Sequence, residues 1–172
     1  MTGAVVWITG LPSSGKSTLA GRLAVALRER GWACCVLDGD AVRDALVPPP
    51  GYDEGGRRAF YETLARLAAL VAAQGTIAVV PATANRAEHR ARARALAPRF
   101  VEVHVGTPLE VCRARDPKGL YARAGRGELA ALPGATEPFE APRSPDVRAE
   151  GGEDERAVAE IVARLGPAPR GG

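Results

Sequence analysis

A glycine-rich loop near the N-terminus carries the first residues with evident chemistry. Residues 10–17 read Gly-Leu-Pro-Ser-Ser-Gly-Lys-Ser and match G-x-x-x-x-G-K-[ST] at every fixed position. An apolar run precedes the loop and a helix-like segment follows it, which is the context that this phosphate-binding motif requires. Its glycines let successive N–H groups wrap a phosphate at a helix N-terminus. Lys16 is expected to reach the β- and γ-phosphates and Ser17 to help hold Mg²⁺, so the loop predicts nucleoside triphosphate binding.

The loop alone leaves the nucleotide and the reaction open. The chain has no N-K-x-D guanine motif, and the third strand-like run ends in Val79-Val80-Pro81, without a carboxylate at the usual Walker B position. A second ligand for Mg²⁺ must therefore come from elsewhere in the chain.

An acidic turn follows the second strand-like run. Asp38-Gly39-Asp40 precedes Arg43 by a few residues. In an open α/β sheet this turn would lie at the carboxyl ends of the strands, beside the phosphate loop. Two carboxylates there could serve Mg²⁺ and a general base, and Arg43 could bind a substrate anion. A plain Asx turn that caps a helix explains the same residues and stays open at this point.

Alternating strands and helices must position these groups. Strand patterns cover 4–9, 33–37, 77–80 and 100–105, and helix patterns cover 17–30, 41–46, 57–74, 86–97, 108–115 and 153–165. This alternation predicts an α/β fold of the P-loop NTPase type, with a parallel sheet flanked by helices on both faces. We expect one domain over 1–172. Residues 116–147 are rich in Gly, Pro and charge and are interpreted as a lid, and 166–172 as a frayed tail.

Composition excludes several classes of protein. The 172 residues are 46% hydrophobic and 25% charged, which argues against disorder, and no apolar stretch approaches the roughly 20 residues of a membrane span. The start lacks the basic and cleavage regions of a secretory signal, and three cysteines do not suggest a disulfide framework. The arginine-rich segment 86–99 lacks a series of stacking aromatics, so nucleic acid is not an expected partner. Only two of the 23 basic residues are lysines, Lys16 and Lys118, which marks both positions as ones where a compact ammonium is needed.

With these residues in place, the sequence resembles the adenylylsulfate kinase family over about residues 4–165. The resemblance rests on the GLxxxGKST loop at 10–18, the LDGDxVR turn at 37–43 and, above all, the string RDPKGLYxxA at 115–124, with further matches at 108–112 and 134–142. It implies a cytoplasmic enzyme of sulfate assimilation, a homodimer, which uses ATP and Mg²⁺ to phosphorylate the 3′-hydroxyl of adenosine 5′-phosphosulfate.

The resemblance also assigns roles to single residues. It implies that Asp40 acts near the acceptor hydroxyl as a general base or a ligand of Mg²⁺-bound water, and that Asp38 supports the metal together with Ser17. Arg43 and Arg57 would bind the phosphosulfate. Tyr52 would stack on the acceptor adenine, and Lys118 would contact substrate from the lid. The ATP-binding set is Gly10, Leu11, Pro12, Ser13, Ser14, Gly15, Lys16, Ser17 and Thr18.

The departures from the family pattern cluster on the acceptor side. Phe60 replaces an asparagine, Glu62 a basic residue and Leu132 an aromatic that packs on adenine, while Thr83 lies in a shortened Ile-Ser-Pro region and Ala41 stands where the family has asparagine. Phe60, Thr83 and Leu132 are kept as candidate acceptor contacts. Loss of a hydrogen-bonding asparagine can change specificity strongly. The alternative is therefore a member repurposed to phosphorylate a hydroxyl of another nucleotide-like or natural-product metabolite, and a nucleotide-binding regulator without turnover is a further one.

Overall fold

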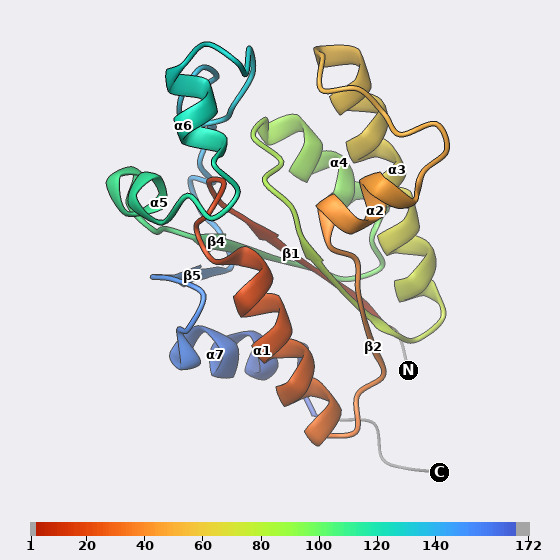
Figure 1. Ribbon diagram of the computed structural model, residues 1–172. Helices are drawn as coiled ribbons and strands as arrows, with labels where there is room; N and C mark the ends of the chain where they lie inside the picture. The colour runs from red at the N-terminus through yellow and green to blue at the C-terminus, as the bar shows by residue number, and fades with distance from the viewer. Residues whose placement is uncertain (1–2, 168–172) are drawn as a thin grey trace.

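Five parallel strands form the centre of the molecule in the computed structural model, which describes residues 3–167 (Figure 1). The strands are β1 (Ala4–Thr9), β2 (Cys34–Val36), β3 (Ile77–Pro81), β4 (Phe100–Val105) and β5 (Val147–Ala149), in the order β2-β3-β1-β4-β5. Central β1 pairs with β3 on one side and with β4 on the other, with Val6 opposite both Val79 and Val101.

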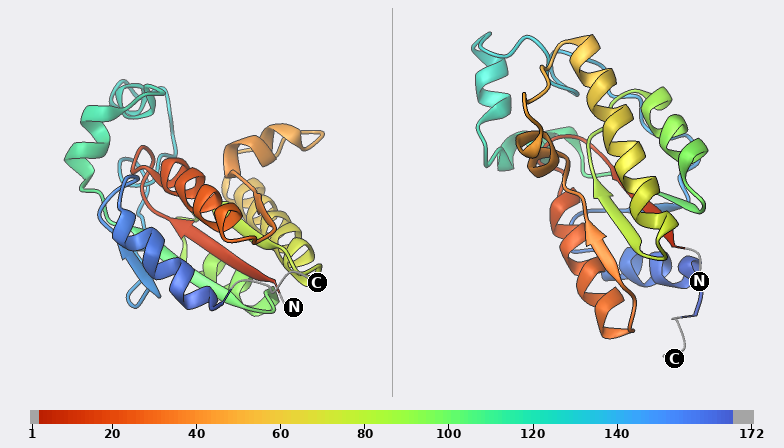
Figure 2. Two further views of the ribbon diagram at one scale, coloured as in Figure 1. Left: turned by 90° about the horizontal axis from the view of Figure 1, so that it is seen from below. Right: turned by 90° about the vertical axis from the view of Figure 1, so that its right-hand side faces the viewer.

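Helices cover both faces of this sheet. They are α1 (Lys16–Glu29), α2 (Gly39–Ala45), α3 (Glu54–Ala73), α4 (Ala87–Leu96), α5 (Leu109–Arg115), α6 (Leu120–Gly125) and α7 (Glu155–Leu165). One face packs on α1 and α7, and the other packs on α3 and α4, as the views of Figures 1 and 2 show. The predicted fold class is confirmed.

The central strand explains why its sequence is apolar throughout. All six residues of β1 are buried. Side chains alternate across a strand, so Val6 and Ile8 enter the core under α1 and α7, whereas Val5 and Trp7 enter the core under α3. A strand covered on both faces has no position for a polar side chain until it ends, and the phosphate loop begins at that end.

The predicted elements shift by a few residues in the structure. Helices α2 and α3 start two and three residues earlier than predicted because Asp38 and Asp53 cap them. Two elements were missed: α6, which lies inside the predicted lid, and the edge strand β5, whose three residues are too few for a strand pattern to stand out. Most of the predicted tail, 168–172, lies outside the described residues. Within 3–167, no helix is both long and apolar enough to cross a bilayer.

Residues 131–141, here named the strap, cross over the carboxyl edge of the sheet and are fastened to it by a buried arginine. Arg90 is 4% exposed. Its Nε donates to Glu102 at 3.0 Å, and its two terminal nitrogens donate to the carbonyls of Ala84 and Glu140, each at 2.6 Å. The guanidinium thus joins α4, β4, the loop after β3 and the strap. A lysine has no planar fork with which to make these three contacts.

Replacing Arg90 by Ala should therefore destabilise the whole fold. Removing one partner of a buried ion pair costs about 3 kcal/mol, which corresponds to a melting temperature lower by roughly 6–12 °C in a chain of this size. Thermal unfolding followed by circular dichroism measures the change. The matched control is Arg92→Ala on the same helix, where the side chain is 45% exposed and pairs with Glu62 at the surface. That loss should stay below about 1 kcal/mol, and equal effects of the two variants would contradict the account.

Candidate functional site

The phosphate loop lies between β1 and α1, at the carboxyl edge of the sheet. Its backbone takes left-handed conformations at Ser13 and Gly15, with φ of 63° and 101°. Gly15 has a second reason to lack a side chain, because a Cβ there would lie 2.6 Å from the backbone nitrogen of Gly152. Lys16 folds back onto its own loop, where Nζ donates to the carbonyls of Gly10 at 3.0 Å and Leu11 at 2.7 Å. The loop therefore has the wrapped backbone that a phosphate cradle needs.

The electrostatics of Lys16 are unusual for a lysine. Loss of contact with water lowers the pKa of its ammonium from 10.5 to about 8, although Asp40 and Asp38 act in the opposite direction. Because burial disfavours the charged form of this amine, an anion bound in the loop would stabilise the ammonium strongly. This property fits a group that meets phosphate.

The acidic turn both caps a helix and reaches the phosphate loop. One oxygen of Asp38, Oδ1, accepts from the backbone nitrogens of Asp40 and Ala41, at 3.0 Å and 3.4 Å. The other, Oδ2, accepts from the hydroxyl of Ser17 at 2.6 Å. The capping role and the metal-side role, which the sequence left as alternatives for the turn, are thus compatible in one carboxylate. The turn and the loop thus bring together a carboxylate and a hydroxyl oxygen, which are donor types that could hold Mg²⁺.

Both lysines of the chain lie at this site. The ammonium of Lys118, between α5 and α6, forms an ion pair with the carboxylate of Asp40 in the first turn of α2. This pairing raises the pKa of Lys118. In Figure 1, α2 and α6 stand on either side of the loop that follows β1. The predicted lid lysine and the predicted catalytic aspartate are therefore neighbours across the site, 78 residues apart in sequence.

Arg43 is the first of the residues that are predicted to bind the acceptor. It projects from α2 and is 6% exposed. Its Nη1 donates to the carbonyls of Pro50 at 2.9 Å and Gly51 at 3.1 Å. The rings of Tyr52 and Phe60 lie over its guanidinium, with centroids 4.3 Å and 4.0 Å from Cζ. The structure thus brings three predicted acceptor residues into direct contact.

Arg57 lies in the first turns of α3 and is held by the strap. Its guanidinium pairs with Glu137 and donates from Nη2 to the carbonyl of Ala131 at 2.6 Å. A small cavity of about 80 Å³ opens beside it and is lined by the buried side chains of Asn85 and His89 as well. Arg57 is therefore a cation at the boundary between α3 and the strap.

The remaining acceptor candidates have different surroundings. Thr83 is half-buried in the loop after β3, and its carbonyl accepts from the hydroxyl of Thr9 at 2.5 Å. Leu132 is buried in a cluster with Cys112 and Tyr121, against which Leu11 of the phosphate loop also packs. Leu132 thus links the strap to the donor loop.

Glu62 lies away from the other residues that depart from the family motif, although the sequence pattern grouped it with them on the acceptor side. It faces α4 and accepts from Arg92 of that helix at 2.8 Å and 2.9 Å, and from Arg66 of its own helix at 2.6 Å. These hydrogen bonds, Arg92 first, lower the pKa of the Glu62 carboxyl from 4.5 to about 2. The carboxylate replaces a basic residue as part of a surface ion-pair network between α3 and α4.

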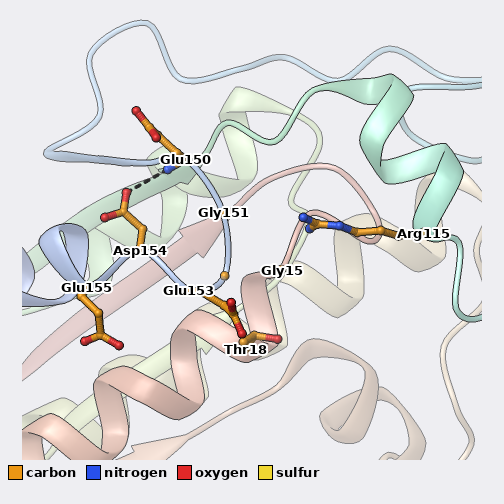
Figure 3. A pocket seen from close by; sticks show the side chains of 9 residues that line it. Gly15, Thr18, Arg115, Glu150, Gly151, Glu153, Asp154 and Glu155 are labelled. Carbon is orange, nitrogen blue, oxygen red and sulfur yellow. Dashed lines mark hydrogen bonds between the residues drawn. The ribbon is translucent and has the colours of Figure 1, made fainter.

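A large pocket borders the phosphate loop on the side of α7 (Figure 3). It has a volume of about 720 Å³ and is lined by Gly15, Thr18, Arg115, Glu150, Gly151, Gly152, Glu153, Asp154 and Glu155. Asp154 shapes the loop before α7, because its side chain accepts from the backbone nitrogens of Glu150 at 3.0 Å and Ala157 at 2.9 Å. In Figure 3, Arg115 lies on the opposite side of the pocket from this loop.

The sequence pattern did not single out this pocket. Two signals could have found it: Arg115 opens the RDPKGLY string, and Gly151-Gly152 directly precedes the last helix. A Cβ on Gly152 would lie 2.7 Å from the carbonyl of Gly15 and 2.8 Å from Cβ of Thr18. Gly152 is therefore required by a close approach between two backbones that are far apart in sequence.

Comparisons with known proteins agree with this geometry. A family model described as adenylylsulphate kinase matches residues 2–150. The chain is 45% identical to the adenylyl-sulfate kinase of Paraburkholderia xenovorans, over 95% of this chain and 90% of the other, and 42% identical to that of Citrobacter koseri, over 95% and 81%.

A solved structure is similar throughout. The structure of Mycobacterium tuberculosis APS kinase CysC in complex with AMPPNP and APS superposes with a TM-score of 0.88 at 38% identity and covers 95% of this chain and 98% of the other. The resemblance seen in the loop, the turn and the RDPKGLY string is confirmed by matches along nearly the whole chain. This chain belongs to the adenylylsulfate kinase family.

Proposed function

We propose that this chain transfers the γ-phosphoryl group of ATP to the 3′-hydroxyl of adenosine 5′-phosphosulfate (APS), giving 3′-phosphoadenosine 5′-phosphosulfate and ADP. The observation that carries the proposal is the meeting of the phosphate loop, Asp40 and Lys118 at one edge of the sheet. It occurs in a chain 38% identical to a kinase whose structure contains AMPPNP and APS. Homologous enzymes of this family are phosphotransferases that act on a hydroxyl group.

ATP binding is assigned to the phosphate loop and the pocket beside it. Residues 10–18 surround the phosphates, with Lys16 turning from its own carbonyls to the β- and γ-phosphates. The open pocket of about 720 Å³ directly adjoins Gly15 and Thr18, which places it within reach of the nucleoside part. Arg115 supplies a planar cation that can stack on a base there.

Mg²⁺ is assigned to Ser17 and Asp38. Their side-chain oxygens are 2.6 Å apart, and hydroxyl and carboxylate oxygens suit a hard cation. No cluster of three or more His, Cys, Asp or Glu within residues 3–167 is arranged to hold a metal ion, in keeping with an ion that needs phosphate oxygens to complete its shell. When bound, the ion offsets the negative charge of the β- and γ-phosphates.

Arg43 and Arg57 are assigned to the phosphosulfate of the acceptor. Each guanidinium has five N–H groups, and the bonds to protein oxygens leave several of them available. Tyr52 is 63% exposed and presents one ring face away from Arg43, which suits stacking on adenine. Thr83, in the loop after β3, and Leu132, in the strap, are kept as further candidate contacts of the acceptor.

Asp40 and Lys118 are assigned to the transfer itself. The 3′-oxygen attacks the γ-phosphorus, the bond from this phosphorus to the β–γ bridging oxygen breaks, and ADP leaves. Asp40 accepts the proton of the attacking hydroxyl. The ammonium of Lys118, beside Asp40, stabilises negative charge at the transferred group, and α6 helps exclude water from it. A homodimer and a cytoplasmic location remain predictions from the family.

Replacing Asp40 by Asn should reduce kcat with APS by about 10² to 10⁴, because the carboxylate that accepts the proton is lost. ADP release with Mg·ATP is measured with and without APS, and mass analysis identifies the product. Asp44→Asn, one turn further along α2 and exposed, is the matched control and should keep full activity. Absence of any stimulation by APS, from protein shown to bind ATP, would overturn the assignment and favour another hydroxyl acceptor. Absence of turnover with every acceptor would favour a regulator.

ATP binding at alkaline pH should be accompanied by proton uptake. The pKa of Lys16 is about 8 without phosphate, so at pH 9 the amine is mostly neutral, and a bound triphosphate raises its pKa again. Calorimetry of ATP binding in buffers of different ionisation enthalpy should show close to one proton taken up at pH 9 and almost none at pH 7. Lys16→Arg, which stays protonated, should remove the uptake at pH 9. Uptake that persists in this variant would show that another group takes the proton.

Replacing Gly152 by Ala should weaken ATP binding in particular. The added Cβ has backbone atoms of the phosphate loop at 2.7 Å, so the two segments must move apart. We expect KM for ATP to rise about tenfold or more, with KM for APS changed much less, in steady-state assays. The control is Gly21→Ala in α1, where no atom lies within 4 Å of the added Cβ. That variant should keep both constants, and an unchanged KM for ATP in Gly152→Ala would contradict the pocket assignment.

A further inference from the structure

Phe60 departs from the family motif, and its ring contacts the guanidinium of Arg43. It stands in α3 where the motif has asparagine, and a phenyl ring cannot replace the hydrogen bonds of an amide. Its ring lies against the guanidinium of Arg43, with the centroid 4.0 Å from Cζ. The ring of Tyr52 also lies against this guanidinium, with its centroid 4.3 Å from Cζ. Arg43 therefore contacts two aromatic rings, one from the segment before α3 and one from α3 itself.

The orientation of Arg43 is restricted by more than the two rings. Its two hydrogen bonds to the chain leave from Nη1, toward the carbonyls of Pro50 and Gly51. The N–H groups on Nε and Nη2 have no partner in the described part of the chain, and together they form the edge that binds an oxyanion through two parallel hydrogen bonds. The direction of that edge depends on what holds the plane of the guanidinium.

Phe60 itself is rigidly supported. It is 3% exposed, and its ring packs against Tyr61 with centroids 5.3 Å apart. The hydroxyl of Tyr61 accepts from the backbone nitrogen of Ala84 at 3.0 Å, and its ring lies 4.6 Å from that of His89. A continuous series of flat groups thus runs from Tyr52 at the surface to His89 on α4. Arg43 is the charged member of this series, and Phe60 joins it to the core.

We propose that Phe60 is a positioning residue for the acceptor, which sets the plane of Arg43 and, through it, the ring of Tyr52. This inference rests on the proposed function and deepens its acceptor side. The unpaired edge of Arg43 then meets the anionic end of a nucleoside phosphosulfate, and the outer face of Tyr52 meets the base. At the position where the motif has an amide, the ring of Phe60 thus fixes the orientation of Arg43 by stacking.

Phe60→Leu tests the proposal, because it keeps an apolar side chain and removes the π-face. We expect KM for APS to rise about tenfold, while KM for ATP and kcat stay within about twofold of the unaltered chain. Phe60→Tyr restores the ring and should return KM for APS to within about threefold. A purely structural role would instead lower the melting temperature without this split between the two substrates. Phe60→Met replaces the leucine variant if that one does not fold.

The matched control is Phe100→Leu. Phe100 packs against the same side of the core, and its ring also lies near a guanidinium, that of Arg94 at 4.7 Å, but away from the acceptor residues. This variant should leave both KM values unchanged. The inference alone is overturned if the unaltered chain turns over APS and Phe60→Leu has a normal KM for it, or if KM rises equally for both substrates. If the unaltered chain does not phosphorylate APS, the proposed function fails first, and the inference with it.

Discussion

The carboxylate of Asp38 joins the two halves of the site. One of its oxygens holds the start of α2, and the other holds the hydroxyl at the start of α1. The phosphate loop and the acidic turn therefore share a single rigid connection at the carboxyl edge of the sheet. Asp40 and Arg43 follow on α2, so the positions of the proposed base and of the acceptor arginine both depend on it. A longer side chain such as glutamate would separate the two helices.

A second connection, made by arginines, holds the far side of the site. Arg57 projects from α3 and Arg90 from α4, and both donate hydrogen bonds to the strap. Each uses several donors at once, which a single lysine amine cannot arrange in a plane. The strap is thereby part of the wall of the proposed acceptor site, rather than a free loop above it. Two of the residues that depart from the family pattern have different places relative to this wall. Phe60 contacts the guanidinium of Arg43, whereas Glu62 pairs with Arg92 on the outer surface.

Local sequence patterns were sufficient for four of the five strands and for the donor loop, but not for β5 or for the contacts between distant segments. The buried run at 4–9 and the glycine-rich loop after it depend on neighbours in sequence, and both are found as predicted. The surroundings of Phe60, Arg90 and Gly152 depend instead on residues tens of positions away. Motif alignment placed Glu62 among the acceptor residues because it follows Phe60 closely. Helical geometry turns residues two positions apart to different faces, which is why it pairs with α4.

The scarcity of lysine gives the chain an unusual chemical selectivity. Apart from the α-amino group, its primary amines are those of Lys16 and Lys118, and both lie at the site. Amine-directed acylating reagents attack only the neutral form. Lys16 has a pKa of about 8, whereas its ion pair raises the pKa of Lys118, so mildly alkaline solution exposes far more free amine at the phosphate loop. In such a solution Lys16 has the larger neutral fraction of the two lysines, and a bound nucleotide, which raises this pKa and covers the loop, should protect it from acylation.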